Sequence, residues 1–168
     1  EAKQVIQSLH SAGIHTVLLS GDHKANCEKV ANELGIKEFY FEQSPQQKLD
    51  TITHLNQTIP TAMVGDGIND APALAKATVG ISLSEATQIA VQSSQVVLMS
   101  HGLQHLPQAL GIGKHTYLTI KQNLFWALAY NVIAIPVAAY GLLGKFAPAY
   151  GALLMGLSDV VLVINSLL

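Results

Sequence analysis

Two aspartates flank a glycine-rich turn in the stretch MVGDGINDAPALAKA, which occupies positions 63–77. Asp66 and Asp70 follow a short apolar run in a chain that is only 12% charged. A hard cation such as Mg²⁺ binds one or two carboxylates and completes its shell with phosphate and water. Glycines leave room for two carboxylates to converge, so the stretch predicts a magnesium site. Taken alone, Asp70 also fits an ordinary helix cap.

Two further polar elements could bind a phosphoryl group. Ser20, Gly21 and Asp22 follow the apolar run HTVLL, and Lys48 lies early in a helix that Ser44-Pro45 can begin. A lysine ammonium suits a phosphoryl oxygen, and a serine hydroxyl with free loop amides can donate to the same group. Each element alone has a simpler explanation, either a turn or a solvated helix charge. Together with the aspartates they predict a phosphoryl-transfer site without a nucleophile.

Residues 1–100 alternate strand-like and helix-like patterns, and this βαβα order predicts an α/β domain with a parallel sheet and helices on both faces, a partial Rossmann-like fold. Loops at the carboxyl ends of parallel strands carry ligands in such sheets, and the polar elements fall in those loops. The sequence predicts strands at 15–20, 61–64, 79–83 and 95–99, and helices at 24–34, from 45 onward, at 71–76 and at 86–92.

Beyond Ser100 the apolar residues recur at helical spacing, which predicts an amphipathic linker helix at 101–122. Residues 123–143 contain no charge, and 148–168 contain one. Crossing a bilayer takes about 20 apolar residues, so the two segments predict a transmembrane hairpin. The alternative is a pair of buried helices in a soluble protein.

The net charge and the cysteine content limit the classes of partner and the cellular compartment that fit this sequence. The net charge of −2 gives no electrostatic footprint for nucleic acid, so this partner class is excluded. Lys114 and Lys121 precede the first predicted span, and the positive-inside rule then places the α/β part in the cytoplasm. The single cysteine, Cys27, fits a reducing compartment.

Polar side chains within the predicted spans are candidate ligands for a transported ion, because polar groups in a bilayer are costly. The candidates are Tyr130, Asn131, Met155, Ser158 and Asp159. A thioether favours a soft ion such as Cu(I), which makes copper the first expectation. Alternatively, the methionine packs against neighbours and the polar groups hold helices together by hydrogen bonds.

Three motifs resemble those of the P-type ATPases, members of the haloacid-dehalogenase-like superfamily. GDGINDAPALA matches their hinge motif, SGD stands where most carry TGD, and SPQQK stands where many carry Pro-x-x-Lys. The resemblance implies that Asp66 and Asp70 organise Mg²⁺ at an aspartyl-phosphate, and that Lys48 and Ser20 contact the phosphoryl group. The catalytic residues that it implies are Ser20, Gly21, Asp22, Lys48 and Asn69.

The resemblance also implies two parts that lie upstream in such proteins: a nucleophilic aspartate in an Asp-Lys-Thr-Gly-Thr motif and a domain that binds the substrate ATP. No DKTG motif occurs between Glu1 and Leu168. We therefore expect this chain to be a C-terminal fragment that depends on the upstream remainder of the pump and is inactive alone. A second departure is Ser84–Gln88, where many relatives carry Gly-Thr-Asp. We expect this segment to lie away from the phosphoryl loops.

The hairpin resembles that of copper(I)-exporting pumps, which carry Tyr-Asn in the first helix and Met-x-x-Ser-Ser in the second. Here Asp159 replaces the second serine, which adds hard anionic character and leaves zinc or another divalent ion open. The resemblance implies a multi-pass protein of the cell membrane that couples aspartyl-phosphate turnover to metal export. Two rival hypotheses remain open: a membrane-tethered phosphatase of the same superfamily, and an inactive fragment.

Overall fold

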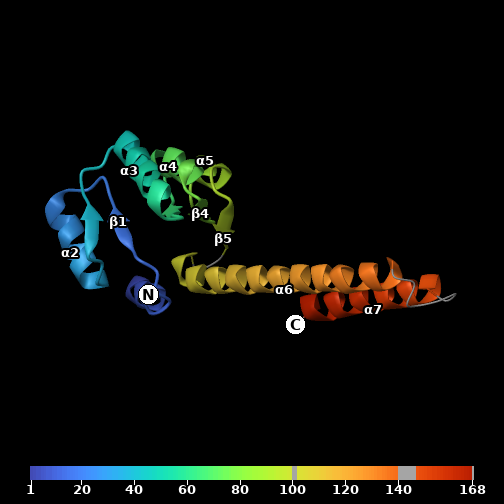
Figure 1. Cartoon of the computed structure of the whole chain (residues 1–168). Coiled ribbons are helices and arrows are strands. Elements are labelled where there is room, and N and C mark those ends of the chain that lie inside the picture. Colours follow the sequence, from blue (N-terminus) through green and yellow to red (C-terminus); the bar gives the residue numbers. More distant parts are fainter. Residues whose placement is uncertain (100–101, 140–146, 168) are drawn as a thin grey trace. The chain divides into compact units, whose positions relative to one another are not determined.

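The computed structural model of the chain describes residues 1–99, 102–139 and 147–167. These residues form two compact units, Glu1–Ala109 and Leu110–Leu168. Figure 1 colours the chain from blue at the N-terminus to red at the C-terminus. The phosphoryl-site candidates lie in the first unit and the cargo candidates in the second.

The first unit alternates helices and strands, as the sequence predicts. Its elements are α1 (Ala2–Ser11), β1 (Val17–Leu19), α2 (Lys24–Leu34), β2 (Glu38–Tyr40), α3 (Pro45–Thr58), β3 (Ala62–Gly65), the 3₁₀ turn η1 (Ile68–Asp70), α4 (Ala71–Lys76), β4 (Val79–Leu83), α5 (Gln88–Gln92), β5 (Val96–Leu98) and the 3₁₀ turn η2 (Gly102–His105).

All described strand pairs are parallel, which confirms the predicted α/β class. The strands fall into two sheets rather than one: β1 pairs with β2, and β4 lies between β3 and β5. In the larger sheet Met63 is opposite Gly80, and Ile81 is opposite Val96. Because the strands run the same way, the loops after β3 and β4 emerge at the same edge.

Local signals explain where the site-bearing helices begin. Ser44 and Gln47 form a reciprocal capping box at the start of α3: the Ser44 hydroxyl accepts from the Gln47 amide, and the Gln47 side chain accepts from the Ser44 amide. Pro45 occupies the first helical position, where its missing N–H costs nothing. Helix α2 ends at Gly35, whose φ of 77° is the left-handed conformation that glycine adopts without strain.

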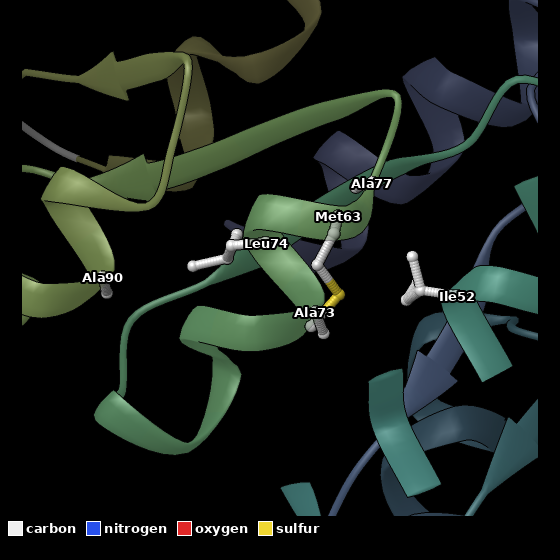
Figure 2. Close-up of a cluster of buried hydrophobic side chains, with 6 residues drawn as sticks. All are labelled: Ile52, Met63, Ala73, Leu74, Ala77 and Ala90. Carbon is white, nitrogen blue, oxygen red and sulfur yellow. The ribbon is translucent and has the colours of Figure 1, made fainter. Parts of the chain in front are cut away.

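A small apolar core joins α3, α4, α5 and the larger sheet. Figure 2 shows its buried members, which are Ile52, Met63, Ala73, Leu74, Ala77 and Ala90. Leu19, the last residue of β1, packs against this cluster. Leu19 of β1 and Met63 of β3 therefore pack around one core, although the two strands share no ladder.

The second unit contains α7 (Ala147–Leu167) and most of α6 (Leu106–Ala139). Among the described residues, three hydrogen bonds link the helices. The Asn165 side-chain amide donates to Asn123 Oδ1 at 2.8 Å, and the Asn123 side-chain amide donates to Ser166 Oγ at 2.8 Å. The Tyr130 hydroxyl donates to the Gly151 carbonyl at 3.3 Å. Asn123 thus faces the end of α7 and Tyr130 faces its beginning, so the helices run antiparallel.

Within the described ranges, none of the helices has the length and apolarity needed to traverse a bilayer. The predicted segments 123–143 and 148–168 reach beyond the described residues, at 140–143 and at Leu168. Their insertion in a membrane stays a prediction.

Candidate phosphoryl-transfer site

The GDGIND stretch forms a tight connection between β3 and α4. After Gly65 ends β3, the amide of Asp70 donates to the Gly67 carbonyl at 3.1 Å and closes the turn. A Cβ placed on Gly65 would lie 2.8 Å from Cβ of Asp70. The Asp70 side chain therefore lies directly against the backbone of Gly65, and only a residue without a side chain fits there.

Lys48 and Asp70, which are 22 residues apart, meet in an ion pair. Lys48 Nζ donates to Asp70 Oδ1 at 2.7 Å, and the two side chains are only 12% and 14% exposed. The first turn of α3 positions the lysine, and Ile52, one turn later, anchors this helix in the core. The sequence predicted that both groups serve one site, and the fold places them in contact.

The donor set fits a magnesium ion. Asp66 is exposed at the start of the turn and Asp70 is largely buried at its end, so two carboxylates border one glycine-rich turn. Mg²⁺ takes one or two carboxylates and fills its remaining positions with water and phosphate oxygens. In the described part of the chain, no group of three or more His, Cys, Asp or Glu residues could enclose a metal by itself.

The Ser20-Gly21-Asp22 loop leaves β1 at its carboxyl end. The Gln43 amide donates to the Ser20 carbonyl at 3.0 Å, and the Asp22 amide donates to Ser20 Oγ at 3.2 Å. A hydrogen bond from the His23 backbone amide, reinforced by the Asn26 side chain, lowers the pKa of Asp22 below its ordinary value. The loop is thus a hydrogen-bonded turn with an ionised carboxylate, beside the segment that leads into Lys48's helix. Asn69 lies within η1, and its side chain is exposed.

His23 and Glu42 form an additional contact beside this loop, which the sequence reasoning missed. His23 Nδ1 lies 3.0 Å from Glu42 Oε1, and the Glu42 amide donates to the Asp22 carbonyl at 2.8 Å. Glu42 adopts a left-handed φ of 51°, which is uncommon for a residue other than glycine. No sequence signal marks that conformation, because glutamate has no preference for it.

We expect His23 to titrate above the ordinary value of histidine, because the hydrogen bond to Glu42 and its negative charge raise the pKa of the imidazole. An NMR titration of the His23 ring protons measures the midpoint, and Glu42→Gln should lower it. A raised folded-state pKa stabilises the fold fully below the unfolded-state pKa, and this contribution is lost as pH rises through the folded-state pKa. An unchanged midpoint in Glu42→Gln would contradict the assignment.

The segment Ser84–Gln88 contacts the GDGIND turn, so the expectation that it lies away from the predicted phosphoryl loops is wrong. The Thr87 amide donates to the Asp66 carbonyl at 3.0 Å. The reason is the sheet order: β3 and β4 are parallel neighbours, so the turn after β4 adjoins the turn after β3.

The cargo candidates divide between the two helices of the second unit. Tyr130 and Asn131 lie on α6, and the Asn131 side-chain amide donates to the Ala127 carbonyl of its own helix at 3.0 Å. On α7, Ser158 Oγ donates to the Met155 carbonyl at 2.8 Å, while the Met155 side chain is 60% exposed and Asp159 is exposed. The hydroxyl of Tyr130 reaches the opposite helix.

Comparison with known proteins finds a family model that matches the first part of the chain and relatives that match nearly all of it. Residues 1–78 match the haloacid dehalogenase-like hydrolase family. The chain is 45% identical, over 98% of its length, to copper-transporting ATPase 2 of Rhizobium meliloti, and 40% identical, over 99%, to copper-exporting P-type ATPase B of Archaeoglobus fulgidus. It covers 20% and 24% of these two relatives, so it spans about a fifth to a quarter of their length.

A solved structure also matches nearly the whole chain. A zinc-transporting PIB-type ATPase in its E2.Pi state superposes on 98% of the chain with a TM-score of 0.91 and 33% identity, and the chain covers 27% of that structure. Residues 1–78 therefore belong to a haloacid dehalogenase-like domain, and the chain as a whole is homologous to one segment of the metal-transporting P-type ATPases.

Proposed function

We propose that this chain is the part of an ATP-driven copper exporter that holds the magnesium and phosphoryl-binding loops and the last membrane hairpin. The observation that carries the proposal is the Lys48–Asp70 ion pair at the GDGIND turn, at 2.7 Å and largely shielded from water. A shielded cation that contacts a carboxylate is an arrangement suited to binding a phosphoryl group together with its metal ion.

Each loop has a defined role in this proposal. Asp66 and Asp70 hold Mg²⁺, which when bound neutralises charge on the phosphoryl oxygens. Lys48 binds a phosphoryl oxygen, and the hydroxyl of Ser20 donates to another. Gly21 lets the loop backbone lie close to the backbone of Gln43, because an added Cβ would be only 3.2 Å from the Gln43 carbonyl oxygen. Asp22 belongs to the loop that assists hydrolysis of the aspartyl-phosphate, and Asn69 lies in the turn between Asp66 and Asp70.

The upstream remainder of the pump supplies the nucleophilic aspartate and the ATP-binding domain. Support comes from the sheet edges: within the described residues, β1 and β3 each pair on one side only. Their free edges leave backbone groups for a further strand at the point where the phosphoryl loops emerge.

The helices α6 and α7 form the membrane part, with the α/β part in the cytoplasm and the protein in the cell membrane. Support comes from the large apolar side chains that they expose, because soluble surfaces rarely show patches of this extent. These exposed side chains include Leu124, Phe125, Trp126, Leu128, Val132, Ile133, Ile135, Leu153, Leu157, Val160, Val161, Val163 and Ile164.

The cargo is Cu(I), held by the Met155 thioether with Tyr130, Asn131, Ser158 and Asp159 contributing. The names of the sequence relatives support copper, and a thioether is a soft ligand. Zinc is the second candidate, because Asp159 is a hard ligand and the superposed structure is a zinc transporter.

The test uses the longer protein to which this proposal assigns the chain. We expect Cu(I) to stimulate an acid-stable phosphoenzyme from labelled ATP, and Asp66→Asn to reduce it at least tenfold by removing a magnesium ligand. Met155→Ala should weaken copper stimulation and leave labelling by inorganic phosphate intact. If Zn²⁺ stimulates phosphoenzyme formation and Cu(I) does not, the transported ion is zinc and the copper proposal is wrong. If the 168-residue chain by itself gives a labelled band, the proposal that the upstream part supplies the nucleophilic aspartate is wrong.

A further inference from the structure

Thr87 lies at the start of α5 and contacts the turn that carries Asp66. Its backbone amide donates to the Asp66 carbonyl at 3.0 Å. Its hydroxyl accepts from the Ala90 amide at 3.4 Å and caps α5. The two contacts use different groups of one residue, so substitutions can separate them.

The amide of Thr87 is fixed by the core. Ala90 is fully buried in the apolar cluster, and Ala86 packs against the same cluster. The two residues therefore hold the chain on both sides of Thr87. By contrast, Asp66, Ile68 and Asn69 in the adjoining turn are exposed. The bond from Thr87 thus joins an exposed turn to a segment that is anchored in the buried core.

We propose that Thr87 is a positioning residue that holds the Asp66 turn in place and so favours Mg²⁺ over the larger Ca²⁺. Mg²⁺ requires near-ideal octahedral geometry, whereas Ca²⁺ accepts irregular and flexible sites. A turn that is tethered at the Asp66 peptide loses less freedom when the small ion binds. The inference rests on the magnesium site of the proposed function.

Two variants at position 87 separate the amide from the cap. Thr87→Pro removes the backbone N–H. The φ of Thr87 is −60°, a value that proline also adopts. Thr87→Ala removes the capping hydroxyl and keeps the N–H, so it is the matched control. The full chain in detergent micelles is titrated with MgCl₂ and separately with CaCl₂, and the amide NMR signals of Gly65 and Gly67 report binding.

We expect Thr87→Pro to weaken Mg²⁺ binding about three- to tenfold relative to Thr87→Ala, the range of one neutral hydrogen bond. Ca²⁺ binding should change less than about twofold, so the Mg²⁺/Ca²⁺ preference falls. Equal Mg²⁺ affinities in the two variants would overturn the role of Thr87 and leave the magnesium site standing. A wild-type chain whose glycine signals do not respond to Mg²⁺ would overturn both.

A measurement on the unaltered chain guards against a proline variant that fails to fold. Amide hydrogen exchange of Thr87 should be slow, because its N–H is bonded, and should slow further when MgCl₂ is added. Exchange at the rate of a free amide, with no response to the ion, would overturn the inference.

Discussion

Replacing Lys48 by methionine is expected to lower the free energy of unfolding of the first unit by about 3 kcal/mol at neutral pH. Methionine keeps the aliphatic length of the side chain but removes the charge 2.7 Å from Asp70 Oδ1. Since the Asp70 side chain is only 14% exposed, water cannot replace the lost partner fully. A urea titration that follows the amide NMR signals of Ala73 and Leu74 measures the change.

The double variant Lys48→Met/Asp70→Asn tests whether this loss comes from the pair. Removing both charges leaves no unpaired carboxylate, so we expect the double variant to be more stable than Lys48→Met. Losses that simply add would contradict the coupling. The same single variant in the longer protein should abolish phosphoryl transfer, because the group that neutralises the phosphoryl oxygen is gone.

Placing alanine at Gly80 is expected to cost about 3 kcal/mol or more of folding stability. The added Cβ would lie 2.5 Å from the Leu74 carbonyl oxygen and 3.1 Å from Gln95 Oε1. The first of these atoms is backbone of α4, next to the fully buried Leu74 side chain, so helix and strand must separate. Because Gly80 is opposite Met63 in the sheet, the displacement reaches the strand that carries the GDGIND turn.

Gly111→Ala is the control for this substitution. It lies within α6, where an added Cβ meets nothing within 4 Å, and alanine favours a helix over glycine. We expect no loss of stability there, and we expect Gly80→Ala to shift the thermal midpoint of the first unit by at least about 10 °C, measured by NMR signal loss. A Gly80→Ala chain as stable as the wild type would show that α4 and β4 are not packed this closely.

Several elements follow from local sequence signals. Helices Lys24–Leu34 and Ala71–Lys76 and strand Val79–Leu83 occupy the predicted residues. Helix Lys24–Leu34 ends at Gly35, which adopts the left-handed conformation. Helix α3 begins after Ser44, the predicted N-cap. Strand Glu38–Tyr40 was missed, because three residues with a charged first member show no clear alternation.

The sequence by itself determined the α/β class, the strand-end location of the polar loops and the motifs that resemble a pump, because these depend on residue type and short spacing. Tertiary structure decided that Lys48 pairs with Asp70, that Thr87 holds the Asp66 turn, and that the strands form two sheets. These contacts join residues about 20 apart in the chain. Sheet order and core packing bring these residues together, and the local periodicity of the sequence predicts neither of them.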